Sequence, residues 1–277
     1  MHRPSIEIRA LHSDADFRQC VELQRATWGA DYDDVVPPSV LNVAQKIGGV
    51  VAGAFEADGR MLGFVFGMVG VRDGRVIHWS DMLAVRADAR DRGVGRQLKE
   101  FQRAAASASG ATTMYWSCDP LVARNAHMNF NKLGVTVDDY IEDMYGASES
   151  DLHRGLGTDR FVVAWPLERA ALARRQSSGA VADVSDARIL NPDGRTPGAA
   201  ALAKLAAAPP PVLRVEIPLD IVSVRDAAPD QAVQWRASTR QAFQWLLANR
   251  SAVQSFVADA ARARGWYLLA RGAPADR

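Results

Sequence analysis

One short stretch of the sequence combines glycines and arginines at a spacing that suits an anion: Arg90, Asp91, Arg92, Gly93, Val94, Gly95 and Arg96. It lies between a predicted strand and a predicted helix. The first N–H groups of a helix have no partner within it and lie at the positive end of its dipole. Glycines let an anion approach the backbone, and the arginines add positive charge. The pattern predicts a phosphate-binding loop; the alternative is a tight turn with a solvated basic rim.

Two other nucleotide-binding loops do not fit this stretch. A P-loop needs Gly-Lys-Ser/Thr after four spacer residues, and the chain has none here. A dinucleotide fingerprint needs a third glycine where Leu98 stands, and an acidic residue about 20 positions further on. That region instead offers Tyr115, Trp116 and Ser117. ATP and NAD are therefore disfavoured as ligands.

Composition narrows the class of protein further. The 277 residues include 33 Lys+Arg and 32 Asp+Glu, so the net charge is +1, which disfavours a nucleic-acid partner. The apolar stretch 61–71 is about half of the roughly 20 residues that a membrane span needs, so no membrane partner is expected. The N-terminal residues form no apolar signal core, and we expect a cytoplasmic protein. Two cysteines, Cys20 and Cys118, and five scattered histidines predict no metal site.

The hydrophobic periodicity predicts an α/β domain over residues 1–167. The region 76–117 reads as strand, loop, helix and strand, which predicts a parallel pair with a right-handed crossover. The remaining predicted strands are 6–11, 48–55, 61–71, 135–141 and 161–165. The predicted helices are 14–27, 39–46, one from the glycine loop to about residue 109, and 120–133.

The rest of the chain has a different composition. Residues 168–211 are rich in Ala and Pro and read as a connector with a short strand at 187–190. Residues 212–277 read as a smaller α/β segment with strands at 212–217 and 266–270, a helix at 227–248, and 253–257 as a partner for the last strand. One helix gives such a segment a thin core, so we expect it to dock on the first domain.

Several motifs resemble a known family. Met82, Leu83, Ala84 and Val85, followed by Arg90-x-x-Gly93-x-Gly95, resemble the acyl-CoA motif of the GCN5-related N-acetyltransferase superfamily. Residues 124–134 are similar to that superfamily's second CoA helix. A subgroup of predicted acetyltransferases of similar length is similar in three further segments, at 116–125, at 157–160, and at 215–218 together with 235–236.

The resemblance implies a fold and a cosubstrate. The fold is a mixed central sheet flanked by helices, with the smaller C-terminal segment docked on it. The cosubstrate is acetyl-CoA or another acyl-CoA, with no metal. Leu83, Ala84 and Val85 are implied to bind the cosubstrate, with backbone hydrogen bonds from Leu83 and Val85 to pantetheine, and the N–H groups of Arg92 to Arg96 hold the pyrophosphate. Arg96, Lys99 and Arg103 form a basic stripe that either reaches the 3′-phosphate or is a solvated face.

The implied reaction moves an acyl group from a thioester to a neutral amine, which calls for a general base. Asp81 is the candidate base, with His78 as a second group and a structural carboxylate as the alternative reading of Asp81. The superfamily often places an acidic tyrosine where this chain has Phe130. Phe130 also lies on an apolar stripe, so core packing is its expected role. Either another group donates the proton, namely Asn125, which also belongs to the second CoA helix, Tyr140, Tyr145 or water, or the thiolate leaves with electrostatic help alone.

Polar residues near strand ends and loops are candidates for binding the acceptor. They are Asp119, Arg124, Asp159 and Arg160, with Arg236 and Arg240 one helical turn apart. The last two could hold a substrate carboxylate, which would favour an amino acid that accepts acetyl or succinyl. A salt bridge to Glu216, or a solvated face, is the alternative for them.

Three hypotheses follow. The first is an acyl-CoA-dependent N-acyltransferase acting on a small primary amine. The second is a protein-lysine acetyltransferase. The third, motivated by Phe130, is a non-catalytic acyl-CoA-binding module. Dimerisation through the C-terminal segment stays open.

Overall fold

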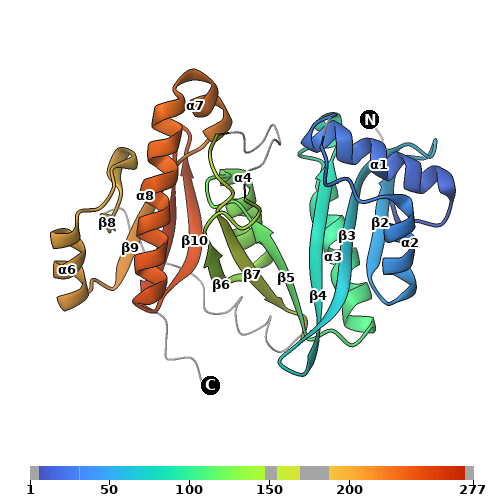
Figure 1. Cartoon of the computed structure of the whole chain (residues 1–277), viewed down its shortest axis with the longest axis horizontal. Coiled ribbons are helices and arrows are strands. Elements are labelled where there is room, and N and C mark those ends of the chain that lie inside the picture. Colours follow the sequence, from blue (N-terminus) through green and yellow to red (C-terminus); the bar gives the residue numbers. More distant parts are fainter. Residues whose placement is uncertain (1–5, 31, 147–154, 169–186, 272–277) are drawn as a thin grey trace. The chain divides into compact units, whose positions relative to one another are not determined.

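The computed structural model describes residues 6–30, 32–146, 155–168 and 187–271. The described residues form two compact units (Figure 1). The first holds those of Met1–Trp116 and Pro166–Ala171, and the second those of Ser117–Ser148, Leu152–Trp165 and Leu172–Arg277. The division between the two units falls between Trp116 and Ser117, inside a strand. The domain boundary predicted near residue 167 stays a prediction.

The first unit is a mixed sheet with helices on both faces. Its strand order is β1-β2-β3-β4-β5, antiparallel up to β4 and parallel between β4 and β5. The strands are β1 (Glu7–Ala10), β2 (Val50–Phe55), β3 (Met61–Arg72), β4 (Arg75–Val85) and β5 (Thr113–Cys118), whose last two residues belong to the second unit. The helices are α1 (Asp14–Trp28), α2 (Pro38–Lys46), the short η1 (Ala87–Ala89) and α3 (Val94–Ala108).

Alternation along the strands builds a core on each face of this sheet. On one face, Phe64 and Phe66 of β3 pack with Phe17 and Leu23 of α1 and with Leu41 of α2. On the other face, apolar residues of β2 and β3 pack with the first turns of α3: Ala52, Leu62, Val65, Val94 and Leu98. Figure 1 shows α3 on the opposite side of the sheet from α1 and α2. The predicted α/β class and the strand–helix–strand unit are confirmed.

The second unit contains an antiparallel pair and a separate sheet. The pair is β6 (Thr136–Ile141) and β7 (Arg160–Pro166). It is preceded by α4 (Ala123–Ala126), which continues as the π-helical η2 (His127–Leu133). The other sheet has the order β10-β11-β9-β8, with β8 (Arg188–Ile189), β9 (Val212–Pro218), β10 (Ser251–Asp259) and β11 (Arg264–Arg271). The helices here are η3 (Pro192–Gly194), α6 (Ala199–Ala207), α7 (Ile221–Ala227) and α8 (Pro229–Ala248).

The C-terminal segment docks on earlier residues of the same unit. The Tyr267 hydroxyl donates to the carbonyl of Pro120 at 2.7 Å. The Asn131 amide bonds both backbone groups of Phe256, at 2.6 and 2.9 Å. A cluster of aromatic rings joins the two parts: Phe130, Phe161, Phe243 and Tyr267. The expectation that this segment packs on the preceding part of the chain is confirmed for the described residues 117–146 and 155–165.

Three elements differ from the sequence prediction. α6 lies in the stretch expected to be a connector, because its Ala-rich run favours a helix and buries Leu202 and Leu205. α7 precedes α8 as a separate helix. The helix predicted at 120–133 starts at Ala123 and becomes π-helical, ending at Gly134 with φ 67°. Among the described residues no helix combines the length and the apolar character needed to cross a bilayer.

Two glycines of β3 provide a test of the packing around α3. A Cβ on Gly67 would clash with Nε2 of His78 and lie 2.6 Å from the carbonyl oxygen of Trp79, whereas a Cβ on Gly70 would lie 3.5 Å from Ile77. We expect Gly67→Ala to lower the free energy of unfolding by about 1–3 kcal/mol through overpacking. Gly70→Ala should leave it unchanged or slightly raised. Urea denaturation of both variants checks this, and equal midpoints would contradict the packing described.

Candidate functional site

The predicted phosphate-binding loop has a backbone suited to an anion. Asp91 and Gly93 both adopt left-handed conformations, with φ 61° and 78°, and α3 begins directly after them. No side chain caps this helix, and its first turn contains no acidic residue. A Cβ on Gly93 would meet nothing nearer than Gln97 at 3.9 Å, so the space in front of the helix is open. The N–H groups of Val94, Gly95 and Arg96 are therefore left for a ligand or water.

The three arginines of the loop differ in their partners. Arg92 lies 3.2 Å from Glu56, which neutralises it. Arg90 and Arg96 are exposed, and neither forms an ion pair with another described residue. Two guanidinium groups thus remain beside the positive end of α3, where they favour a ligand with more than one negative charge.

The predicted basic stripe along α3 is wrong as a surface feature. Lys99 is 5% exposed, its Nζ donates to Oγ of Ser80 at 2.7 Å, and it lies 3.9 Å from the centre of the Trp116 ring. Arg103 pairs with Glu100 at 3.5 Å. The reason is the helical phase: the face of α3 that packs on the sheet also includes position 99. Arg96 is the member of the stripe that remains exposed beside the loop.

Strand β4 presents an edge for an extended ligand. Its parallel pairing with β5 covers Ile77 to Trp79 and goes no further among the described residues. Arg86 N donates to Leu62 O at 2.8 Å, and bonded pairs alternate along an antiparallel ladder. Ala84 is therefore bonded toward β3, while Leu83 and Val85 direct their N–H and C=O groups to the opposite edge. Leu83 and Val85 are the two residues that the family resemblance implies to bond to pantetheine, whereas the backbone groups of Ala84, also expected to bind the cosubstrate, face β3.

A β-bulge places Asp81 on this edge. Phe66 pairs with Met82 and Gly67 with Ser80, so Asp81 is the extra residue. Its side chain is open to solvent and accepts a hydrogen bond from Trp79 Nε1 at 3.2 Å. Partial desolvation by the surrounding protein raises the pKa of Asp81, and the Trp79 bond acts in the opposite direction. A carboxylate with a raised pKa at the end of an open edge is suited to accept a proton.

His78 lies on the other face of the sheet from Asp81. It is 1% exposed, packs against α3, and its Nε2 has no hydrogen-bond partner among the described residues. Burial, together with the charge of Lys99, lowers the pKa of His78 to about 4. The structure therefore does not bring the two predicted catalytic groups of β4 together, and His78 is neutral near pH 7.

Most of the predicted acceptor residues form one buried ionic network in the second unit. Arg236 donates to both oxygens of Asp119, at 3.0 and 2.7 Å, and to the carbonyl of Leu156 at 2.9 Å. Arg160 lies 3.8 Å from the same carboxylate. Burial lowers the pKa of Arg236, but the charge and hydrogen bonds of Asp119 outweigh it and keep the pKa above its ordinary value. Arg236 thus forms a salt bridge, with Asp119 rather than with Glu216.

A second carboxylate continues this network. Asp159 is fully buried and accepts hydrogen bonds from Arg240, at 2.8 and 2.6 Å, and from the Tyr140 hydroxyl at 2.5 Å. Arg240 also contacts Glu142 and Asp143. Burial raises the pKa of Asp159, but these donors outweigh it and lower the pKa overall. The proton of Tyr140 is therefore committed to Asp159, and Arg240 is surrounded by protein carboxylates.

The remaining predicted residues stand apart from that network. Arg124 and Asn125 are exposed on α4. The Tyr145 hydroxyl is exposed and bonds to Ser117 Oγ at 2.8 Å. Phe130 is 5% exposed with its ring against Phe161 and Tyr267, so it packs in the core as expected and supplies no proton. Roles for Arg124, Asn125 and the network residues in binding an acceptor stay predictions.

Sequence reasoning did not identify two groups near β4. Ser80 is buried and bonds to Lys99, and Gln102 is buried beside His78, with both polar atoms of its side chain lacking partners among the described residues. The available signal was a polar residue, Gln102, three positions after Lys99 on the face of α3 that also carries Leu98.

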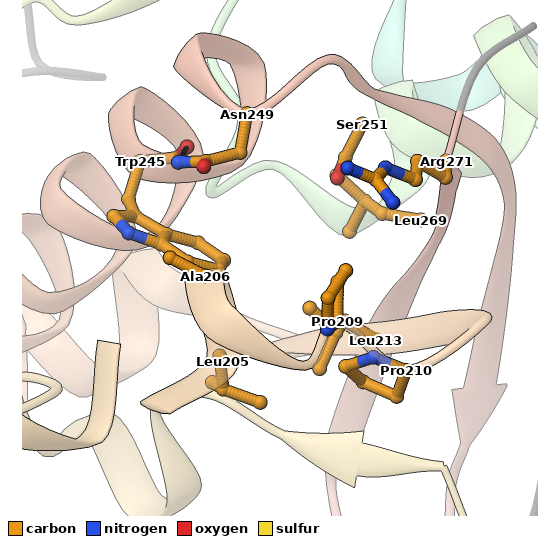
Figure 2. A pocket seen from close by; sticks show the side chains of 10 residues that line it. All are labelled: Leu205, Ala206, Pro209, Pro210, Leu213, Trp245, Asn249, Ser251, Leu269 and Arg271. Carbon is orange, nitrogen blue, oxygen red and sulfur yellow. Dashed lines mark hydrogen bonds between the residues drawn. The ribbon is translucent and has the colours of Figure 1, made fainter. Parts of the chain in front are cut away.

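A pocket in the second unit offers little chemistry (Figure 2). It lies beside α6 and α8, and seven of its ten lining residues are of apolar type. Arg271 is its charged residue, with Asn249 and Ser251 as further polar groups. The lining residues are Leu205, Ala206, Pro209, Pro210, Leu213, Trp245, Asn249, Ser251, Leu269 and Arg271. It contains no acid or base, and within the described residues no group of His, Cys, Asp and Glu could hold a metal ion.

Comparisons with known proteins add similarities of fold. No family model and no curated protein sequence matches the chain. Solved structures are similar to part of it. The NatC complex bound to Gag peptide and CoA is 16% identical over 59% of this chain and 99% of that chain, with a TM-score of 0.48. The ribosomal-protein-S18-alanine N-acetyltransferase from Escherichia coli is 17% identical over 59% and 95%, with a TM-score of 0.44.

A third solved structure is a putative acetyltransferase from Salmonella typhimurium with its cofactor acetyl-CoA. It is 19% identical over 59% of this chain and 95% of that chain, with a TM-score of 0.47. At these identities and scores the similarities support no conclusion about function. A functional proposal for this chain depends on its own residues.

The buried state of His78 predicts a pH dependence. Its pKa of about 4 lies below the unfolded value of about 6.5, so the unfolded chain binds a proton first as the pH falls. The free energy of unfolding should therefore decrease by about 2 kcal/mol between pH 7 and pH 5 through this group. The His78 ring should stay neutral by NMR down to about pH 5. His78→Gln should remove this part of the pH dependence, and an identical profile would contradict the burial of a neutral imidazole.

The Asp119–Arg236 pair predicts a large stability loss on truncation. Arg236→Met leaves a buried carboxylate without its main partner, so we expect a loss of about 3–5 kcal/mol in the free energy of unfolding. The matched control is Arg262→Met, because Arg262 is 75% exposed and 3.7 Å from Asp259. It should cost less than about 0.5 kcal/mol. Guanidinium denaturation compares them, and similar midpoints would rule out the buried pair.

Proposed function

We propose that this protein is an acyl-CoA-dependent N-acyltransferase. The observation that carries the proposal is that two binding features occur together in the first unit. One is the uncapped start of α3 beside Arg90 and Arg96, and the other is the β4 edge with the outward-facing groups of Leu83 and Val85. A ligand that satisfies both has a multiply charged anion at one end and an extended chain with amide groups. Coenzyme A has this construction.

The dimensions of the edge agree with this ligand. From Val85 to Asp81 the strand advances four residues, about 13 Å at the usual rise. A pantetheine arm held by its pyrophosphate at the loop would run along Val85 and Leu83 and bring its thioester close to Asp81. The backbone groups of β4 would bond to the amides of the arm as a neighbouring strand would.

The residues of the edge then provide the chemistry. The amine must lose a proton before it attacks, because amino groups have pKa values of about 8 to 10.4. Asp81 accepts that proton, directly or through water. The amine nitrogen bonds to the thioester carbon, a backbone N–H of the edge stabilises the oxyanion, and the C–S bond breaks. The thiolate leaves and takes a proton from solvent, since Phe130 cannot supply one.

The acceptor is proposed to be a small primary amine. The amino acid suggested by Arg236 and Arg240 loses part of its support, because both guanidinium groups are occupied by protein carboxylates. An acceptor recognised by its amine alone is sufficient for the chemistry of Asp81. The buried Phe130 favours one alternative, a module that binds acyl-CoA without turnover.

Two glycines at opposite ends of α3 test the phosphate-binding loop. Gly93 and Gly110 have φ values of 78° and 86°, and neither has a close neighbour in the Cβ direction. Tryptophan at either position costs similar backbone strain, but only at position 93 would it fill the space in front of the helix. Gly93→Trp should weaken CoA binding by at least about 30-fold by calorimetry, roughly 2 kcal/mol, and Gly110→Trp should not change it. Equal affinities would show that the loop is not the site.

Turnover distinguishes the enzyme from the binding module. Thiol release from several acyl-CoAs is measured with a panel of small amines and with lysine-containing peptides. An enzyme of the proposed class releases thiol with small amines, and Asp81→Asn lowers kcat by about 10²-fold or more. Binding of CoA without thiol release from any amine would favour the module, and release with peptides alone would favour a protein acetyltransferase.

A further inference from the structure

Lys99 lies at the point where β4 and β5 stop pairing. The last residues paired between these strands are Trp79 and Tyr115. The next residues are Ser80 on β4 and Trp116 on β5, and Lys99 of α3 contacts both. Its Nζ donates to Oγ of Ser80 at 2.7 Å and lies 3.9 Å from the centre of the Trp116 ring. A side-chain contact thus follows directly after the last backbone pair.

A buried position such as this one rarely holds a lysine ammonium group. Lys99 is 5% exposed, and lysine is rarely buried unless its charge is used. The other buried residues of α3 are the apolar Val94, Leu98 and Ala106, together with the uncharged Gln102. Leucine or methionine would fill the space without the cost of burying a charge. Two contacts that an apolar residue could not make are the hydrogen bond to Ser80 and the cation–π contact with Trp116.

We infer that Lys99 is a positioning residue. It links β4 to β5 where their pairing ends, next to the open edge of β4 that runs from Asp81 to Val85, and it thereby fixes the position of the thioester beside Asp81. The inference rests on the proposed function. Asp81 directly follows Ser80, and as the bulge residue it has no partner of its own on β3. Its position therefore depends on how firmly Ser80 is held.

The position of Lys99 on α3 connects the two ends of the proposed site. α3 begins at the phosphate-binding loop, and Lys99 is five residues beyond Val94, about 7.5 Å along the axis. The start of this helix thus binds the pyrophosphate, and its Lys99 side chain holds the point where β4 and β5 separate. The distance between a ligand's pyrophosphate and that point is therefore set by one rigid helix.

The test compares Lys99→Met, Ser80→Ala and the double variant with wild type. Lys46→Met is the control, because Lys46 is exposed at the end of α2. Calorimetry gives the Kd for CoA, and thiol release gives kcat and KM with acetyl-CoA. We expect both single variants to bind CoA within about two-fold of wild type and to lose about 10-fold in kcat. The double variant should lose no more than Lys99→Met, because both changes break one tie.

A readout independent of activity accompanies the kinetics. In Lys99→Met the amides of the β4–β5 ladder, at Ile77 to Trp79 and Thr113 to Tyr115, should exchange hydrogen about 10-fold faster than in wild type. In Lys46→Met they should not. This measurement applies as long as the variant folds, and Ser80→Ala, a smaller change, provides the same reading if Lys99→Met does not fold.

The possible outcomes separate the two proposals. If wild type binds and turns over acetyl-CoA but Lys99→Met keeps the wild-type kcat and exchange rates, the role of Lys99 is wrong and the proposed function stands. Additive losses in kcat would also overturn it, since they would show that Lys99 and Ser80 act separately. If wild type itself does not bind CoA, the proposed function fails, and the positioning role fails with it.

Discussion

The proposed site depends on the interrupted hydrogen-bond ladder of β4. A strand inside a sheet has all its backbone groups paired, and an open edge invites another extended chain. Here β4 is paired with β3 on both sides of Asp81, whereas its pairing with β5 covers Ile77 to Trp79 and goes no further among the described residues. The bulge at Asp81 lies just beyond the last of those pairs. The edge beyond it is therefore both exposed to a ligand and placed at the start of α3.

The second unit uses polar residues for a different purpose. Asp119, Asp159 and Arg236 are buried and Arg240 is partly buried, and their bonds hold α8 to residues 119 and 159. Buried charges must be paired, and here each carboxylate receives two or more hydrogen bonds. Such pairing specifies one arrangement of the C-terminal segment, since a displaced α8 would leave charges without partners. The aromatic cluster around Phe161 adds the apolar contact that the ion pairs lack.

The sequence predicted the elements and the glycine turn before α3 well, because both depend on local patterns. Glycine at 93 is needed for a left-handed residue before α3, and this requirement is visible without a structure. The partners of charged residues were harder to foresee. Arg92 and Arg96 look equivalent in the sequence, yet Glu56 neutralises only Arg92. Lys99 was expected at the surface because lysine is usually exposed. Whether a helix residue is buried depends on its exact position around the helix, and a shift of one residue changes it. Arg236 pairs with Asp119, which lies 117 positions away in the sequence, and no local pattern encodes such a pair.

The aromatic contacts between Phe130, Phe161, Phe243 and Tyr267 have a consequence for shortened forms of the chain. Phe243 and Tyr267 come from the last third of the sequence, and they cover rings that belong to residues before 167. A fragment cut at the predicted domain boundary near residue 167 would expose these rings and would deprive the carboxylates of Asp119 and Asp159 of Arg236 and Arg240. Exposed aromatic patches promote aggregation. The predicted boundary therefore does not delimit a unit that can be expressed by itself.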